Sequence, residues 1–187
     1  MDNGQVRLTK RRIRSKILLR LKTQKEDDRE RKSRLIKGKL FRTLLFKKAK
    51  IIMFYIAFDG EVKTEEMIKE AQNLGKKIAV PVCRTKCSKM TPCLLDFTAP
   101  LITGPYGVKE PAVKKSIKLE DLDLVIVPGV AFDKKNNRLG RGKGFYDRFL
   151  SSLPNSVPSI GLAYDFQILP SVPATKTDFG VNKVIFA

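Results

Sequence analysis

Six segments of strand length, several of them almost uninterrupted apolar runs, constrain the fold of this chain more than any other feature. Strands that are apolar on both faces are typical of parallel sheets covered by helices on both sides. The sequence therefore predicts a mostly parallel sheet with a helical layer on each face. The expected strands are residues 50–58, 77–83, 93–97, 122–129, 158–163 and 181–186.

The first 50 residues are predicted to form two helices. Within residues 6–21 the apolar positions Ile13, Ile17, Leu18 and Leu21 have helical spacing, and the opposite face is basic. Thr23, followed three residues later by Glu26, predicts a capping box that opens a second helix. This helix is expected to end near Lys47. Its expected buried stripe comprises Leu35, Ile36, Leu40 and Leu44.

Two more helices are expected after the first strand. Thr64 is a candidate N-cap for a helix that stops at Gly75, and residues 145–153 predict another. Because helices alternate with strands, the predicted fold class is α/β, a three-layer α/β/α arrangement with a mostly parallel sheet. A chain of 187 residues is expected to form a single domain over 1–187, with 1–48 as a basic helical pair packed on the α/β core.

Positive charge is concentrated at the start of the chain. The sequence has 38 Lys and Arg against 19 Asp and Glu, a net charge of +19, and residues 1–50 hold 19 of these basic residues against five acidic ones. Such a segment could bind the phosphates of a nucleic acid. It could equally be a solvated helix pair whose charge attracts small anions. Composition alone leaves both interpretations open.

The chain has no histidine, which excludes Ser-His-Asp and Cys-His catalysis and imidazole metal ligands. Its chemistry must rest on carboxylates, cationic side chains, backbone amides or a bound metal, a set that suits phosphoryl transfer. The three cysteines, Cys83, Cys87 and Cys93, are odd in number and closely spaced, which favours neither a disulfide framework nor a zinc site. We interpret them as reduced thiols, with a redox or iron–sulfur role as the alternative.

No segment has the length of a membrane span. The longest apolar run, residues 51–58, is far shorter than the ~20 apolar residues that a spanning helix needs. No apolar stretch of the kind found in signal peptides follows the basic start. The sequence therefore predicts a cytoplasmic location and no membrane partner.

The segment GRGKGFYD at residues 140–147 predicts a phosphate-binding loop between a strand and a helix. Alternating glycines let successive backbone amides converge on one anion, and the free N–H groups of the following helix point to the same place. Arg141 and Lys143 add positive charge. The spacing is neither that of a Walker A loop nor that of the dinucleotide fingerprint. A flexible surface loop is the alternative, but Asp147 adds a carboxylate suited to magnesium beside bound phosphates.

Four other segments of the chain carry recognisable motifs. VPGVAFD stands at 127–133, KILLR at 16–20, GEVKTEE at 60–66 and GPYGVKEP at 104–111. Taken in chain order together with 138–147, these segments resemble the signature of the 5-formyltetrahydrofolate cyclo-ligase (methenyltetrahydrofolate synthetase) family. The resemblance implies a NagB/RpiA/CoA transferase-like fold. It also implies ATP-dependent cyclisation of 5-formyltetrahydrofolate to 5,10-methenyltetrahydrofolate, with ADP and phosphate as products, through phosphorylation of the formyl oxygen.

The resemblance implies a role for each matching residue. Arg141 and Lys143 would be the catalytic groups, and Glu61 would accept hydrogen bonds from the pterin. Asp147 and Asp178 would hold Mg²⁺, although Asn182 stands where the family has aspartate. The implied ATP-binding residues are Lys16, Arg20, Arg138, Leu139, Gly140, Arg141, Gly142, Lys143, Gly144, Phe145 and Tyr146. The implied substrate-binding residues are Ile56, Glu61, Phe145 and Tyr146.

Each of these assignments has a simpler alternative. Lys16 and Arg20 can be read as solvated charge, Ile56 and Phe145 as core residues, and Asp178 as a surface carboxylate. The expected partners are ATP and 5-formyltetrahydrofolate, which can carry a polyglutamate tail, and a monomer without bound nucleic acid is expected. The alternative functions are a basic nucleic-acid-binding protein and an ATP-dependent kinase or ligase that acts on another acceptor.

Overall fold

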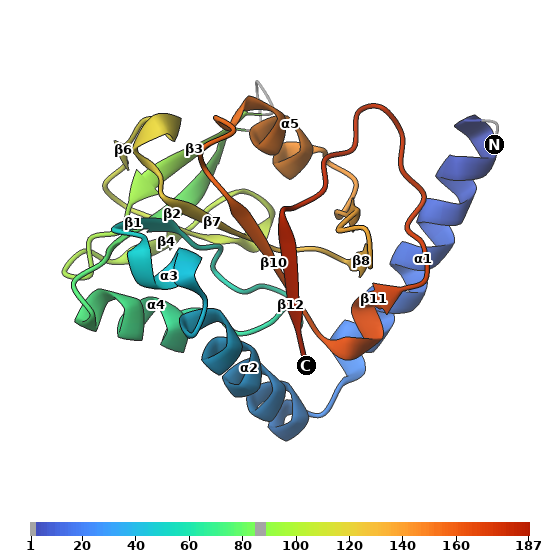
Figure 1. The fold of residues 1–187 in the computed structure, drawn as a ribbon, viewed down its shortest axis with the longest axis horizontal. Helices are drawn as coiled ribbons and strands as arrows, with labels where there is room; N and C mark the ends of the chain where they lie inside the picture. The colour runs from blue at the N-terminus through green and yellow to red at the C-terminus, as the bar shows by residue number, and fades with distance from the viewer. Residues whose placement is uncertain (1–2, 85–88) are drawn as a thin grey trace.

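A seven-stranded sheet forms the centre of the protein, in a computed structural model that describes residues 3–84 and 89–187. The strand order is β12-β10-β7-β1-β2-β3-β6. The first five of these strands are parallel, and β3 pairs antiparallel with both β2 and β6 (Figure 1). The predicted α/β class with a mostly parallel sheet is confirmed. The strands are β1 Ile51–Met53, β2 Lys77–Arg84, β3 Lys89–Leu94, β6 Lys115–Ser116, β7 Leu124–Val127, β10 Ser159–Ala163 and β12 Lys183–Phe186.

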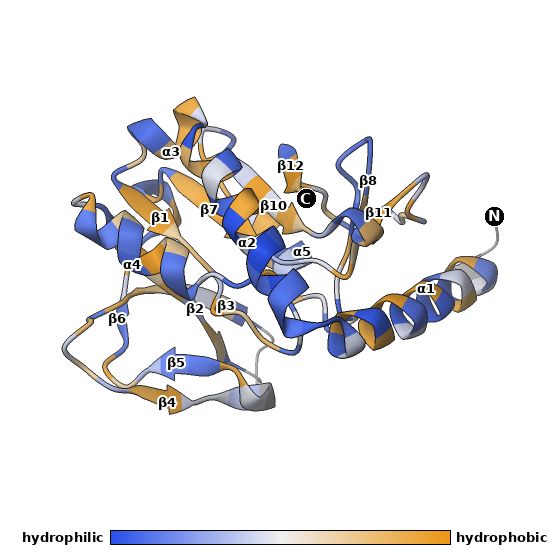
Figure 2. Cartoon of the chain, turned by 90° about the horizontal axis from the view of Figure 1, so that it is seen from below, coloured by the Kyte–Doolittle hydropathy of each residue, from blue (hydrophilic) through white to orange (hydrophobic). Residues whose placement is uncertain are grey.

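Helices cover both faces of this sheet. In β7, Leu124 and Ile126 belong to the hydrophobic cluster shared with α2, α3 and α4, whereas Val125 and Val127 belong to the cluster shared with α5. Successive residues of a strand point to opposite faces, so the two clusters lie on opposite sides of the sheet. Figure 2 shows the apolar residues concentrated in β1, β7 and β10. The helices are α1 Asn3–Thr23, α2 Glu26–Phe41, α3 Leu44–Lys48, α4 Glu65–Asn73 and α5 Phe145–Ser152.

Several short strands that the sequence did not indicate lie outside the main sheet. β8 Ala131–Asp133 pairs with β9 Arg138–Leu139 and with β11 Ile168–Leu169, and β4 Leu101–Thr103 pairs with β5 Lys109–Pro111. Strands of two or three residues are too short for a periodic pattern, which explains why they were missed. Within residues 3–84 and 89–187, three short 3₁₀ helices complete the fold. They are η2 Pro105–Gly107, η3 Leu119–Asp121 and η4 Asp165–Gln167.

The long helix α1 packs on the rest of the chain along one stripe. Ile17 and Leu21 are buried, and Ile13 and Leu18 are partly buried, as the helical spacing predicted. The N-terminal half of α1 runs beside the loop between β11 and β12 (Figure 1), and Val6 is buried there. None of the helices within the described ranges combines the length and the apolar character needed to cross a membrane.

The prediction of one capped helix from Thr23 to Lys47 is wrong. Thr23 lies inside α1, where its hydroxyl donates to the carbonyl of Leu19 at 3.1 Å. The N-cap of α2 is Lys25, whose side chain makes no capping hydrogen bond. α2 ends at Phe41, and α3 begins after Thr43, whose hydroxyl accepts from the Phe46 N–H. Thr43 caps α3 and so divides the predicted helix in two.

This break changes the predicted buried stripe. Ile36 and Leu40 are fully buried, but Leu35 is 49% and Leu44 is 70% exposed. Leu44 lies in the first turn of α3 and is therefore out of phase with α2. Thr64 precedes α4 as predicted, but its hydroxyl forms hydrogen bonds with the backbone of the loop at residues 55–57 and makes no capping bond.

Two predicted strands have other bounds. β1 ends at Met53, so residues 54–58 leave the sheet and lead to the turn at 58–61. β3 covers Lys89–Leu94, earlier than the predicted 93–97, because its register follows β2.

Candidate functional site

A cleft of ≈ 300 Å³ lies beyond the carboxyl ends of the parallel strands β1, β2 and β7. In open α/β sheets this edge is where ligands bind. Ten of the residues singled out from the sequence line the cleft, although they come from distant parts of the chain. They are Ile56, Glu61, Arg138, Gly140, Arg141, Lys143, Gly144, Phe145, Tyr146 and Asp147.

The glycine-rich segment joins β9 to α5 at the rim of this cleft. Gly142 and Gly144 have φ values of 99° and 68°, in the left-handed region that side chains disfavour. Gly144 is the N-cap residue of α5, so the free N–H groups of that helix face the loop. Both glycines are required by the backbone conformation, and the segment has the geometry of a helix N-terminal anion site.

The inner face of α1 carries two cations that the motif at 16–20 did not indicate, one bound to this loop and the other to Asp178. The Arg14 guanidinium donates through Nε to the carbonyl of Gly140 at 2.8 Å. Lys10, which is 7% exposed, forms an ion pair with Asp178. Both lie on the helix face of Ile17 and Leu21.

The structure does not bring Lys16 and Arg20 to the cleft. Both are exposed, and the Arg20 guanidinium lies 4.3 Å from the ring centre of Phe166. Positions 16 and 20 are turned by roughly 100° from the inward stripe, given 3.6 residues per helical turn. Lys10 and Arg14 share the helix face of the buried Ile17 and Leu21. This spacing was the signal in the sequence that favoured them over the K-x-x-L-R match at 16–20.

A buried ion pair stands at the back of the cleft. The side chain of Arg138 is 2% exposed and donates through one terminal nitrogen to Asp147 Oδ1 at 2.6 Å. Burial lowers the pKa of Arg138, and the neighbouring Asp147 offsets this only in part. Among the described residues, Arg138 Nε and the Tyr146 hydroxyl are buried without a hydrogen-bond partner. Such atoms are rare in folded proteins and indicate a place where a polar ligand can bind.

Asp147 and Asp178 lie next to each other in space. Asp147 Oδ1 also accepts from the Phe179 N–H at 3.2 Å, and Phe179 follows Asp178 in the chain. Oδ2 of Asp178 accepts from Lys10 and from the Thr175 hydroxyl. Burial alone would raise the pKa of Asp178, but these partners outweigh it and lower the pKa.

These contacts occupy Oδ1 of Asp147 and Oδ2 of Asp178. The second oxygen of each carboxylate suits a magnesium ion that also binds phosphate oxygens. Within residues 3–84 and 89–187, no cluster of three or more acidic, cysteine or histidine side chains could hold a metal by itself. The two aspartates therefore fit a magnesium ion that arrives with a phosphorylated ligand.

Glu61 stands on the opposite wall, in a strained turn. Asp59 and Gly60 before it have φ values of 51° and 83°. Glu61 Oε1 accepts from Arg141 Nε and Oε2 accepts from the Phe58 N–H, both at 3.2 Å. Burial raises the pKa of Glu61, and the nearby Arg141 lowers it by less. Burial therefore outweighs the stabilisation that these two partners give to the charged carboxylate.

Other predicted residues line the apolar part of the cleft or pack behind it. Ile56 and Phe145 are partly buried and contribute to its walls. Leu139 is 1% exposed and packs in the β8–β9 core, so only its backbone can face a ligand.

Cys83 also lines the cleft, and burial together with Glu110 raises its pKa to about 11. Cys83 and Cys93 are free thiols, whereas Cys87 lies outside the described residues.

Similarity to known proteins identifies the family. Residues 6–187 match the model of the 5-formyltetrahydrofolate cyclo-ligase family. The 5-formyltetrahydrofolate cyclo-ligase of Haemophilus influenzae is 38% identical over 71% of this chain and 73% of its own length. That of Mus musculus is 28% identical over 97% of this chain and 95% of its own length.

A solved structure agrees with these sequence relatives. The NMR structure of the 5,10-methenyltetrahydrofolate synthetase of Aquifex aeolicus superposes with a TM-score of 0.83 at 30% identity, and it covers 95% of this chain and 89% of that one. Fold, site geometry and sequence similarity therefore lead to one conclusion: this chain belongs to the 5-formyltetrahydrofolate cyclo-ligase family.

Proposed function

We propose that this chain uses ATP to convert 5-formyltetrahydrofolate to 5,10-methenyltetrahydrofolate, with ADP and phosphate as products. The γ-phosphoryl group of ATP is transferred to the formyl oxygen, which makes that oxygen a good leaving group. N10 of the folate then attacks the formyl carbon and closes the ring, and phosphate departs with the former formyl oxygen. The observation that carries this proposal is that one cleft joins a glycine-rich anion loop to a buried carboxylate, Glu61, on the facing wall.

The nucleotide side of the site is proposed to be the loop at 140–144 with the first turn of α5. Backbone N–H groups of the loop would hold the phosphates, and Arg141 and Lys143 would neutralise the charge that develops during transfer. Arg14 supports the loop through Gly140 and adds a cation beside it. Arg138 holds Asp147 in place from the protein interior.

The folate side is proposed to be Glu61 with the apolar wall of Ile56, Phe145 and Tyr146. A carboxylate pairs well with the two N–H donors at the amino-pyrimidine edge of a pterin. The Tyr146 hydroxyl, which is buried without a partner among the described residues, would donate to or accept from the bound substrate. The depth of the cleft would hold the formyl oxygen in line with the phosphates.

Asp147 and Asp178 are proposed to hold a magnesium ion together with the ATP phosphates. When bound, this ion neutralises phosphate charge during transfer. Asp178 would then bind the ion and keep its ion pair with Lys10. The proposal rests on the adjacency of the two carboxylates and on the oxygen that each leaves without a described contact.

We further propose that residues 1–187 act as one cytoplasmic, monomeric domain. The contact of Arg14 with Gly140 supports the single domain, since the basic helix contributes directly to the loop. Removal of residues 1–48 is expected to abolish activity.

The test is direct. Purified protein with Mg-ATP and 5-formyltetrahydrofolate should produce the long-wavelength absorbance of the methenyl product, and chelation of magnesium should stop it. The Asp147→Asn variant should lose most of this turnover. If folded protein consumed ATP only with a different acceptor, the folate assignment would be wrong and the phosphate assignment would survive.

A further inference from the structure

Arg141 spans the cleft and is held by the turn at residues 58–61. Its guanidinium donates through Nε to Glu61 Oε1 at 3.2 Å and through one terminal nitrogen to Asp59 Oδ2 at 3.0 Å. The other terminal nitrogen donates to the carbonyls of Phe58 at 3.3 Å and of Asp59 at 3.5 Å. All three of its nitrogens therefore face the folate side, away from the phosphate loop that carries the residue.

The same contacts occupy the carboxylate that is proposed to recognise the pterin. Glu61 Oε1 is taken by Arg141 and Oε2 by the Phe58 N–H. A pterin edge needs both oxygens of the carboxylate for a bidentate pairing. In this arrangement Arg141 competes with the folate for Glu61.

Asp59 provides the second anchor of Arg141, and its backbone is strained for this position. Its φ of 51° lies in the left-handed region, which costs free energy for any residue other than glycine and is tolerated best by Asn and Asp. Its other oxygen lies 3.5 Å from the Lys22 ammonium. Asp59 can therefore lose Arg141 without becoming an unpaired carboxylate.

We propose that Asp59 is a positioning residue for Arg141, and that Arg141 couples the binding of the two substrates by moving from the Asp59–Glu61 turn to the triphosphate. This inference rests on the proposed function. We call Arg141 together with Asp59 and Glu61 the Arg141 clasp.

The coupling follows from competition for one guanidinium. A triphosphate in the loop at 140–144 brings more negative charge to Arg141 than the turn offers, and arginine binds phosphate oxygens in a bidentate manner. When Arg141 leaves, Glu61 regains Oε1 for the pterin while Lys22 stays with Asp59. The nucleotide thus raises the affinity for folate, and by linkage the folate raises the affinity for nucleotide by the same factor.

The first measurement is the dissociation constant of 5-formyltetrahydrofolate by calorimetry, without nucleotide and with a non-hydrolysable Mg-ATP analogue. The ratio of the two constants should lie in the range of roughly 5- to 150-fold that is typical of coupled sites. Inorganic tripolyphosphate should reproduce most of this ratio, whereas adenosine should not, because the phosphates displace Arg141. A ratio near one would overturn the clasp.

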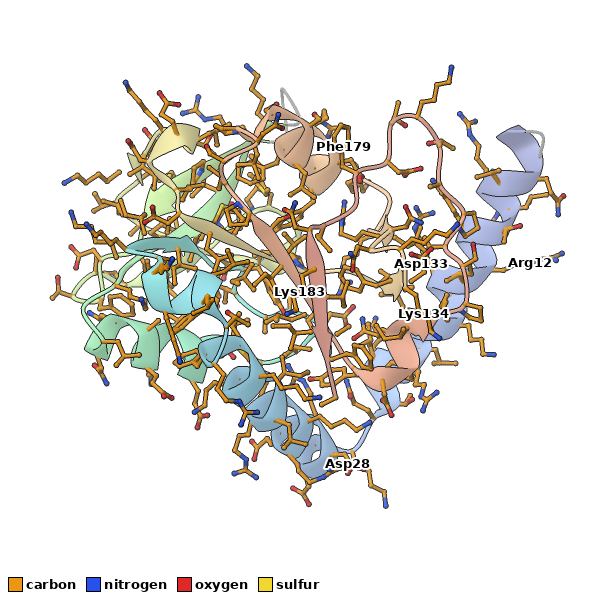
Figure 3. All side chains as sticks on the ribbon, in the orientation of Figure 1. Arg12, Asp28, Asp133, Lys134, Phe179 and Lys183 are labelled. Carbon is orange, nitrogen blue, oxygen red and sulfur yellow. The ribbon has the colours of Figure 1, made fainter. Side chains whose placement is uncertain are left out.

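The second measurement uses Asp59→Asn, which keeps the shape of the side chain and tolerates the left-handed backbone. With the charge of one anchor removed, folate should bind more tightly in the absence of nucleotide, so the ratio should fall at least about threefold toward one. Asp28→Asn is the matched control. Asp28, in the first turn of α2, also forms an Asp–Arg pair, with Arg31 at 3.3 Å (Figure 3). This control should keep the wild-type ratio.

The outcomes separate the two proposals. Folate that binds equally well with and without nucleotide would refute the clasp and leave the proposed function intact. Folate that binds in neither condition would refute the proposed function and the clasp with it. An Asp59→Asn ratio equal to or above that of the wild type would show that Asp59 does not anchor Arg141. Thermal unfolding of both variants checks that each is folded.

Discussion

Two turns of this protein each contain a mostly buried carboxylate and a residue in the left-handed conformation. The surroundings of the two carboxylates shift their pKa values in opposite directions. In the turn at 58–61 the strained residue is Asp59 and the carboxylate is Glu61. In the turn at 133–137 they are Asn136, with a φ of 62°, and Asp133. Asp133, labelled in Figure 3, is the last residue of β8, and the turn follows it.

The two carboxylates differ in how far their hydrogen bonds offset their burial. Asp133 is buried, and the side chain of Glu61 is mostly buried. Burial alone would raise both pKa values, but Asp133 accepts from Asn137, from the Val172 N–H and from the Lys135 N–H, which lower its pKa below the ordinary value. For Glu61 the partners do not outweigh burial, and its pKa is raised. The turn at 133–137 therefore satisfies its carboxylate internally, whereas the turn at 58–61 leaves a carboxylate suited to a ligand.

The largest expected effect is the loss of stability on Asp133→Ala. Three backbone N–H groups, those of Lys135, Asn137 and Val172, would lose their acceptor. Each unsatisfied donor costs roughly 1–3 kcal/mol, so the free energy of unfolding should fall by about 4 kcal/mol. Urea denaturation measures this. Glu61→Ala is the matched control and should cost only about 1 kcal/mol, the low end of this range, because a single, partly buried backbone N–H loses its acceptor. Equal losses would remove the distinction between the turns.

The next effect concerns catalysis. Glu61→Gln replaces the charged acceptor that is proposed for the pterin by a neutral one. Because a hydrogen bond to a charged group contributes roughly 1.5–3 kcal/mol, the KM for 5-formyltetrahydrofolate should rise about 10- to 100-fold. The KM for ATP should change much less. Steady-state kinetics with each substrate varied in turn separates the two, and a larger rise for ATP would move Glu61 to the nucleotide side.

The pH dependence of stability should have opposite signs in the two turns. Asp133 has a lowered pKa, so its contribution is present above its ordinary value of 3.8 and is lost as the pH falls through the lower folded-state pKa. Glu61 has a raised pKa, so its contribution is present below 4.5 and is lost as the pH rises through the higher folded-state pKa. From pH 4.5 to 7, Glu61→Gln should therefore gain stability relative to the wild type. Unfolding curves that stay parallel over this range would contradict the sign for Glu61.

The fold could be predicted where the signal was local. β7 and β10 are continuous apolar runs, and both were placed correctly to within two residues. The division between α2 and α3 was missed because the leucines on either side of Thr43 continue the apolar pattern. The short strand β11 pairs with β8 from a distant part of the chain, whereas β8 and β9 form a local hairpin whose strands are too short for a periodic pattern.

The same distinction holds for the site. The glycines at 140–144 could be identified from spacing alone, because a strand, a loop and a helix follow each other directly. Arg14 contacts Gly140 across 126 residues, and Arg141 contacts Asp59 across 82. Neither pair has a local pattern. The phase of α1 pointed to Arg14, but nothing in the sequence relates Asp59 to Arg141.

The smallest expected effect comes from the strained residue of the Asp133 turn. The backbone carbonyl of Asn136 accepts from the Val181 N–H at 3.0 Å, a contact that any residue could make. Asn136→Ala keeps that contact, loses the exposed side-chain hydrogen bond to the Asn182 carbonyl at 3.2 Å and forces alanine into the left-handed region, so the free energy of unfolding should fall by about 1 kcal/mol. Asn136→Gly removes the strain and should lie closer to the wild type. Neither change should alter the folate KM, because Asn136 does not line the cleft. If Asn136→Ala raised the folate KM as Glu61→Gln is expected to do, the turn at 133–137 would also take part in folate binding.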